Sequence, residues 1–335
     1  MSELAQELFA LVDELNRRFP SPRGRGHAEE VPFSLWSTLM ELGLPRIGIP
    51  EHHGGVGGEL DDLAVVVQAL ATYGHGTPLV EASTAAWAAQ GVAAVPATGL
   101  GVVAVPHMQA GLPTRRFQAR WGRLAHWAIV VHADAPPQLI TFDGADVVEE
   151  ADVAGEPVDT IEVQSAVVVD AGELPSQSAL RARMGILRTS ALLGTAYGVY
   201  DLTREHVLQR RQFDRPLAEI PAVRHALAEM RTGLVQTQAA HERALDAWRG
   251  GTPEQALVPV AAARIIAAQT ASACAQVAHQ LHGAMGVTNE YALHRFTRRL
   301  WAWRDADTTE RQWAEELGAR VLSASEHEFW EVLTS

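Results

Sequence analysis

The amino-acid sequence predicts an α+β protein that is mostly α-helical, with a small β-domain between two helical regions. Apolar residues recur at helical spacing near the N-terminus, and the last half of the chain holds three long segments of good helix formers. Between these regions the pattern changes to short β-branched runs separated by Gly, Pro and Asp. We therefore expect an N-terminal helical domain at residues 1–100, a middle β-domain at 101–172 and a C-terminal four-helix bundle at 173–335.

The composition of the chain excludes several kinds of partner and site. The 335 residues suffice for two or three packed units, and 47% hydrophobic with 20% charged residues is ordinary for a globular protein. A net charge of −13 argues against a nucleic-acid partner. Cys274 is the only cysteine, which excludes internal disulfides and cysteine-based zinc sites. The sequence shows no signal-peptide pattern and no window of about 18 consecutive apolar residues, so we expect a cytoplasmic protein without a membrane span.

The N-terminal region predicts three helices and a glycine-rich turn. Helices are expected over residues 4–15 and 35–42, the second ending at Gly43, and residues 18–32 between them read as a loop. A turn at 47–58 then precedes a helix at 60–73. Its adjacent His52 and His53 could ligate a metal. Because neighbouring positions rarely share one ion and no carboxylate–histidine cluster lies nearby in the sequence, we expect no metal site.

The rest of the chain divides into strands and then helices. Strands are expected at residues 101–106, 128–132, 138–142 and 165–170. Long helices follow at 179–211, 217–249 and 253–284, with a breaker and N-cap at Gly250 to Pro253 between the last two. A further helical stretch from about 291 to 333 completes a four-helix pattern.

Two segments carry residue types suited to a phosphate-bearing ligand. Arg210 to Leu217 contains three arginines, Gln212 and Phe213; arginine binds phosphate oxygens bidentately, and an aromatic ring can stack on a planar ligand. Gln280 to Glu290 contains small residues that let a backbone approach another group, with N–H groups that bind phosphate. An ordinary corner between helices with a solvated basic rim, and an ordinary helix C-cap, are the alternatives.

The residue patterns of these segments resemble motifs of the acyl-CoA dehydrogenase family. The resemblance rests on Arg-x-Gln-Phe-x-Arg-Pro-Leu at 210–217 with His-Ala-Leu-Ala-Glu-Met at 225–230, on the turn Pro-Glu-His-His-Gly-Gly-Val-Gly at 50–57, and on 280–299. It implies FAD as cofactor and an oligomer. By resemblance, Arg210, Gln212 and Phe213 contact the FAD of a neighbouring protomer, and Gln280, Gly283 and Gly286 contact its adenosine-diphosphate half. Ala284 departs from the family pattern, since a second glycine usually stands there.

The family reaction needs a carboxylate base for the α-proton of the thioester. Counting forward from Gly283 places Asp307 at the position of the usual glutamate and Thr309 at the position of a flavin-contacting threonine. Glu310 is a nearby substitute for Asp307. The base position that a minority of members use falls on Met184. Aspartate is shorter than glutamate by one bond, about 1.5 Å, and a solvated acidic turn is the alternative interpretation of residues 305–310.

The resemblance implies an FAD-dependent oxidation of an acyl-CoA to the 2,3-enoyl-CoA in fatty-acid or steroid side-chain catabolism, with an electron-transferring flavoprotein as acceptor. The pattern is most similar to short actinobacterial members, several of which pair two unlike subunits in an α2β2 tetramer. The alternative is a catalytically inactive partner that completes the FAD site of a sister chain. The missing glutamate, Ala284 and the loop at Val105 to Gly111, which lacks the family's acidic and hydroxyl contacts, favour that alternative.

Overall fold

The computed structural model describes residues 3–21, 33–92, 95, 99–107, 116–132, 135–142, 145–163, 167–169, 172–212 and 214–323. The chain is mostly helical with one small main sheet, which confirms the predicted fold class. It divides into two compact units, described separately below: unit 1 comprises Met1–His27, Ala64–His75 and Gly185–Ser335, and unit 2 comprises Ala28–Leu63 and Gly76–Met184. The predicted domain limits at residues 100 and 172 stay a prediction.

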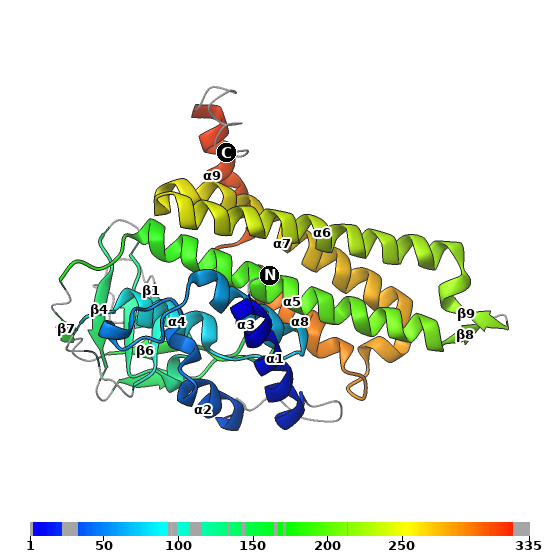
Figure 1. Ribbon diagram of the computed structural model, residues 1–335, viewed down its shortest axis with the longest axis horizontal. Coiled ribbons are helices and arrows are strands. Elements are labelled where there is room, and N and C mark those ends of the chain that lie inside the picture. Colours follow the sequence, from blue (N-terminus) through cyan, green and yellow to red (C-terminus); the bar gives the residue numbers. More distant parts are fainter. Residues whose placement is uncertain are drawn as a thin grey trace. The chain divides into compact units, whose positions relative to one another are not determined.

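Unit 2 is built on a seven-stranded sheet in the order β5-β6-β2-β1-β3-β4-β7 (Figure 1). The strands are β1 Gly101–Pro106, β2 Arg116–Arg120, β3 Trp127–Val130, β4 Gln138–Thr141, β5 Asp146–Val148, β6 Val158–Glu162 and β7 Val167–Val169. Neighbours are antiparallel except for β1 and β3, which are parallel.

The four strands that the sequence predicts are present as β1, β3, β4 and β7. The sequence analysis missed β2, β5 and β6, because their polar residues hide the strand pattern. In β6 the carboxylate of Asp159 is fully buried and is held by the backbone N–H and guanidinium of Arg123, at 2.6–3.2 Å. A buried charge is tolerated when it is paired and hydrogen-bonded in this way.

One helix that the sequence did not predict, α4 (Leu79–Ala88), packs on this sheet against β1 and β3. Because most of its residues are buried, its sequence lacks the amphipathic pattern that predicts a helix. Its alanines join residues of the sheet and of the following helix in one apolar cluster, which comprises Ala85, Ala88, Ala89, Trp127, Ile129, Leu139 and Leu180.

The N-terminal helices are close to their predicted limits, as α1 Glu3–Arg18, α2 Phe33–Glu41 and α3 Leu60–Thr72. Gly43 has φ 71°, the left-handed conformation expected of a glycine that follows a helix. Two short 3-10 helices, η1 Leu44–Arg46 and η2 Glu51–His53, lie in the glycine-rich turn of unit 2. In unit 1, the hydroxyl of Tyr73 donates to Asp13 at 2.7 Å and ties the end of α3 to α1.

The helices of the C-terminal half form the predicted bundle, which belongs to unit 1 except for residues 177–184 (Figure 1). They are α5 Gln177–Gln209, α6 Pro221–Gly250, α7 Pro253–His282, α8 Leu293–Arg304 and α9 Glu310–Ser323, with η4 Leu217–Glu219 and η5 Gly283–Val287. The helix α7 packs against α6, α8 and α9, and it begins with a capping box between Thr252 and Gln255.

The prediction of one helical stretch from 291 to 333 is wrong within the described residues. The chain breaks between α8 and α9 at residues 305–309, where Asp307 has φ 67°. A left-handed residue cannot continue an α-helix. Residues 324–335 lie outside the described part of the chain.

The segment Pro253–Val287 is the one stretch of described residues that is long and apolar enough to cross a membrane. About two thirds of its apolar window (67%) is buried inside the protein. The helix α7 within it packs against α6, α8 and α9, as a core helix does.

Gly194 and Gly198 of α5 allow a close crossing with α3. A Cβ atom at Gly194 would lie 2.1 Å from the carbonyl oxygen of Gln68, and one at Gly198 would lie 2.6 Å from that of Thr72. The ring of Phe296 also lies 2.5 Å from a Cβ at Gly198, whereas the nearest obstacle at Gly194 is backbone, so a side chain at 194 can be accommodated only if the two helices separate.

We therefore expect Gly194→Ala to lower the free energy of unfolding by about 1–3 kcal/mol, as overpacking does. Urea unfolding followed by circular dichroism measures this change. Gly250→Ala is the matched control, because no heavy atom lies within 4 Å of a Cβ built there. Equal stability of the two variants would contradict the close crossing.

Candidate functional site

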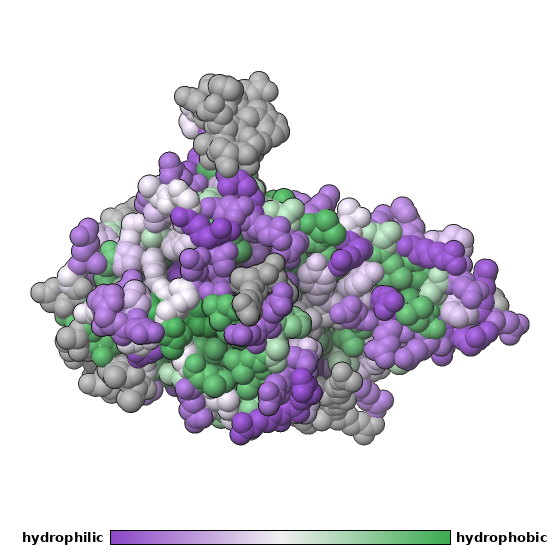
Figure 2. Space-filling view, in the orientation of Figure 1, coloured by the Kyte–Doolittle hydropathy of each residue, from purple (hydrophilic) through white to green (hydrophobic). Residues whose placement is uncertain are grey.

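The basic segment after α5 forms a small hairpin. The strands β8 (Arg211–Gln212) and β9 (Arg215–Pro216) pair across a turn in which Asp214 has φ 60°, and Arg211 Nη2 donates to the Asp214 carbonyl at 2.6 Å. Arg210, Arg211, Gln212 and Arg215 are all exposed, and the tip of the hairpin is hydrophilic in Figure 2. Phe213, which the sequence predicts as a flavin contact, lies outside the described residues.

An apolar cluster joins the base of this hairpin to the C-terminal end of α7. Val207, Leu217 and Val223 are its buried members, and Leu281 packs against them. The predicted residues Arg210 and Gln212 on one side, and Gln280 and Gly283 on the other, therefore come from segments that fold against each other.

A pair of stacked imidazoles strengthens the same junction. The rings of His206 on α5 and His282 on α7 lie 4.3 Å apart at 19°. His282 Nδ1 donates to the Ala278 carbonyl at 2.8 Å, so Nε2 is the nitrogen that accepts from the Tyr291 hydroxyl at 3.3 Å. Burial lowers the pKa of His282 to about 4, and burial followed by the charge of Arg210 lowers the pKa of His206.

The two predicted glycines of the α7 end have different surroundings. Gly283 is exposed with φ 61°, and no heavy atom lies within 4 Å of a Cβ built there, so the turn is open to solvent. Gly286 is buried, and a Cβ there would lie 2.8 Å from that of His282 and 3.1 Å from Leu293 Cδ2. Gly286 is therefore required for packing within the chain, because a side chain there would collide with His282 and Leu293.

The candidate base Asp307 lies in the turn between α8 and α9, where its Oδ2 accepts a hydrogen bond from Arg188 Nε at 3.0 Å. The two side chains form an ion pair in which Arg188 is 3% and Asp307 is 23% exposed. The sequence analysis missed Arg188. The available signal was an arginine inside the apolar stretch of α5, but its partner is 119 positions away in the chain.

A second buried arginine, Arg264 on α7, holds the same turn. Its Nη2 lies 3.1–3.5 Å from the carbonyl oxygens of Trp303, Arg304, Ala306 and Thr308. These oxygens belong to the negative end of α8 and the turn after it, where a cation is favourable. Burial lowers the pKa of Arg264 to about 10, and the nearby Asp307 opposes this shift.

Thr309 and Glu310 have partners within the chain. Thr309 N donates to Gln312 Oε1 at 2.9 Å and Gln312 N donates to Thr309 Oγ1 at 3.3 Å, a reciprocal capping box at the start of α9. Glu310 Oε1 accepts from Gln269 at 3.1 Å. The flavin contact that the sequence predicts for Thr309 would therefore come from a helix-capping hydroxyl.

The predicted site residues form two separate groups within unit 1. Arg264 lies beside Asp307, and the 16 residues from Arg264 to Gln280 span about 24 Å along α7 at 1.5 Å per residue. Figure 1 accordingly shows the hairpin and α9 toward opposite ends of the bundle. The chain brings Arg210, Gln212, Gln280 and Gly283 together, and it keeps Asp307 and Thr309 away from them.

The two groups differ in their chemistry. The first has exposed guanidinium groups beside an open glycine turn, which fits a diphosphate. The second has a carboxylate that is partly open to solvent. In the described part of the chain no group of three or more His, Cys, Asp or Glu side chains is arranged to hold a metal ion.

Comparison with known proteins matches both ends of the chain to family models. Residues 5–95 match the acyl-CoA dehydrogenase N-terminal domain and residues 179–306 match the acyl-CoA dehydrogenase C-terminal domain. The acyl-CoA dehydrogenase IpdE2 of Mycobacterium tuberculosis is 28% identical over 316 residues, which cover 92% of this chain and 89% of that protein.

Two solved structures share the fold over nearly the whole chain. The ChsE4-ChsE5 complex of Mycobacterium tuberculosis aligns with a TM-score of 0.83 and 21% identity, over 97% of this chain and 99% of the other. The Tcur3481-Tcur3483 steroid ACAD G363A variant aligns with a TM-score of 0.77 and 18% identity, over 96% of each chain.

The stacked imidazoles predict an acid-sensitive junction. The unfolded chain binds a proton at His282 as the pH falls through 6.5, whereas the folded chain does so only near 4. The contribution of neutral His282 to the free energy of unfolding is thus fully present above pH 6.5 and is lost as the pH falls toward 4. His75 and His241, with pKa values of about 4, act in the same direction.

We expect the urea midpoint of the wild-type chain to fall with pH across this window and to fall less steeply in His282→Asn. The slope against pH is the measurement, so a constant loss of stability in the variant does not affect the result. His52→Asn, at an exposed position outside the junction, serves as the control. An unchanged slope in His282→Asn would show that His282 does not remain neutral in the folded chain.

Proposed function

The chain belongs to the acyl-CoA dehydrogenase family, whose members are FAD-dependent oxidoreductases, and we propose that it is a subunit of an enzyme that oxidises an acyl-CoA to the 2,3-enoyl-CoA. The observation that carries this proposal is the shared apolar cluster that brings the 210–217 hairpin and the 280–286 turn together. Both segments match the family's flavin-contacting motifs, although they are far apart in the sequence.

In this proposal Arg210, Gln212 and Phe213 hold the FAD of a neighbouring subunit, and Gln280, Gly283 and Gly286 hold its adenosine-diphosphate half. The exposed arginines supply charge for the diphosphate, and the glycine turn leaves its backbone accessible. Bound FAD would supply the hydride acceptor. The proposed electron acceptor of the enzyme is an electron-transferring flavoprotein.

Asp307 is the proposed base for the α-proton of the thioester. Its side chain is 23% exposed, and Arg188 Nε donates to Oδ2 at 3.0 Å. The buried Arg188 and Arg264 restrain the turn that carries Asp307, and a fixed base is more effective than a mobile one. Glu310 is the substitute if Asp307 does not serve.

The separation of the two groups supports a site that is shared between subunits. Residues about 24 Å apart along one helix are not adjacent in one chain, so a second chain would bring its own group beside them. The groove between α6 and α7, lined by small residues such as Ala228, Gly233, Ala240 and Ala273, offers a surface for close helix packing. We propose a sister acyl-CoA dehydrogenase chain as partner, in an α2β2 assembly.

The proposed substrates are CoA thioesters of bulky acids, including steroid side chains. Support comes from the fold shared with the Tcur3481-Tcur3483 steroid ACAD, and the two-protein ChsE4-ChsE5 complex supports an assembly of unlike chains.

A second candidate is a catalytically inactive partner subunit, and the Arg188–Asp307 ion pair favours it. A carboxylate that accepts a proton loses its charge and with it the ion pair to a buried arginine, which opposes proton abstraction. In this case the chain would contribute Arg210, Gln212 and Gln280 to a flavin site whose base belongs to the sister chain.

The proposal expects Arg210→Gln to weaken FAD binding by about tenfold to a hundredfold, the range for a lost charged hydrogen bond. The protein is co-expressed with its sister chain, and the flavin absorbance per subunit and the FAD dissociation constant are measured. Arg311→Gln, an exposed arginine of α9 paired with Glu315, is the matched control. Retention of full flavin in Arg210→Gln would contradict the assignment.

The variant Asp307→Asn tests whether this chain or its sister chain supplies the base. If Asp307 is the base, flavin is retained but its bleaching by acyl-CoA under anaerobic conditions slows by more than about a hundredfold. Asp307→Glu, which keeps the charge beside Arg188, should retain part of the rate, and Asp305→Asn is the control at an exposed neighbour. Unchanged bleaching in Asp307→Asn would reject this base assignment and leave Glu310 or a base of the sister chain.

A further inference from the structure

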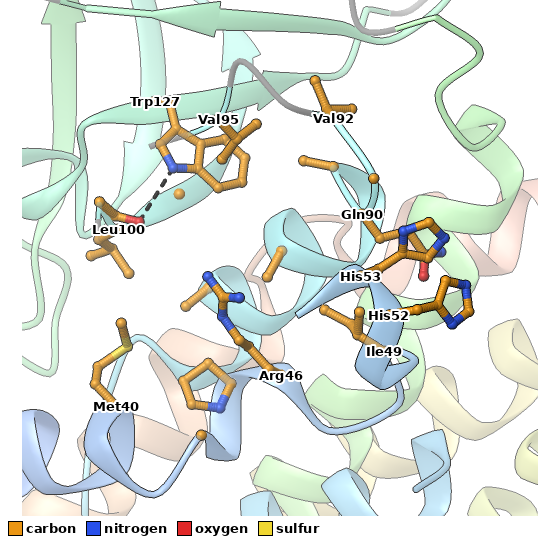
Figure 3. Close-up of a pocket in the computed structure, with 18 residues that line it drawn as sticks. Met40, Arg46, Ile49, His52, His53, Gln90, Val92, Val95, Leu100 and Trp127 are labelled. Atoms are coloured by element: carbon orange, nitrogen blue, oxygen red, sulfur yellow. Dashed lines mark hydrogen bonds between the residues drawn. The ribbon is translucent and has the colours of Figure 1, made fainter. Parts of the chain in front are cut away.

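Unit 2 contains a cavity of about 410 Å³ between the glycine-rich turn, α4 and the start of β1 and β3 (Figure 3). This volume lies in the range of small-molecule sites. Residues of the turn form one wall and residues of α4 and the sheet form the other. None of the residues proposed to hold FAD or to act as base lines this cavity.

The charge of the cavity is opposite to that of the chain. Arg46, His52 and His53 line it, and no aspartate or glutamate is among its described lining residues. In a protein with a net charge of −13, a recess that carries a guanidinium and two imidazoles without a carboxylate favours an anion.

The polar side chains of this wall are held in place by the turn. Arg46 Nη1 donates to the Gly54 carbonyl at 2.8 Å, and in Figure 3 the guanidinium points into the cavity. The ring of His53 rests on the backbone of Gly91 at the end of α4, where a Cβ would lie 3.1 Å from His53 Cε1. Because these groups are fixed before a ligand arrives, less ordering is required on binding.

Apart from Gln90, the other side chains that line the cavity are apolar and include Met40, Ile49, Ala86, Val92, Leu100 and Trp127. The indole of Trp127 lies across Gly101, where a Cβ would come within 2.2 Å of the ring, and its Nε1 donates to the Gly99 carbonyl at 3.3 Å. Since this N–H already has a partner, the ring offers the cavity mainly an apolar surface.

We propose that this cavity binds a small amphiphilic carboxylate, with the carboxylate at Arg46 and the apolar body against Trp127 and the alanines of α4. A guanidinium is the side chain best suited to a planar carboxylate. The ligand is a free acid rather than its CoA thioester, because the described lining residues offer one cationic wall and no second basic cluster for the phosphates of CoA. This gives a role to the His52–His53 turn, which the proposed reaction leaves unused.

The test compares octanoate with octanol, which has the same chain and no charge, by isothermal titration calorimetry on the purified protein without any acyl-CoA. We expect octanoate to bind at least about tenfold more tightly than octanol. Arg46→Gln should remove this preference, Arg46→Lys should restore part of it, and Ala86→Leu should weaken both ligands by filling the cavity.

Arg116→Gln, on strand β2 and not among the lining residues, is the matched control. Equal affinity for octanoate and octanol, absence of octanoate binding in the millimolar range, or wild-type selectivity in Arg46→Gln would each overturn the proposal. The assay involves neither flavin nor turnover, so its outcome is independent of the proposed dehydrogenase function.

Discussion

The burial of α7 is the constraint on which the rest of unit 1 depends. This helix is apolar on most of its surface, so it requires α6, α8 and α9 as neighbours. Its C-terminal end then places Gln280 and Gly283 beside the hairpin, and its middle places Arg264 beside the turn that carries Asp307. The length of the helix between these points keeps the two groups of site residues apart.

Buried arginines fix the loops around this core. The buried Arg264 donates to carbonyls at the end of α8, and Arg299 Nη1 donates to the Gly74 carbonyl at 2.5 Å. Burial lowers the pKa of Arg299 to about 10, which still leaves the side chain charged near neutral pH. In a chain without lysine, arginine thus supplies both exposed positive charge, as at Arg210, and the buried charges that bind carbonyl groups inside the protein.

The sequence was sufficient for the fold class and for most helices, because long amphipathic or alanine-rich segments bounded by Gly and Pro are strong local signals. It was insufficient for α4, most of whose residues are buried, and for β6, whose Asp159 is paired with a distant arginine. In the candidate site, local motifs led to the hairpin, the glycine turn and Asp307. The Arg188–Asp307 pair and the His206–His282 stack involve residues far apart in the chain, and only the tertiary structure reveals such pairs.

The apolar character of α7 also has a consequence for synthesis. On the ribosome this segment emerges after α6 but before α8 and α9, which cover it in the finished protein. A nascent chain at that stage presents about 30 residues of membrane-like hydropathy of which only the face against α6 can be covered. The period between the synthesis of α7 and that of α9 is therefore when this protein most needs a chaperone, or a partner subunit, to prevent aggregation.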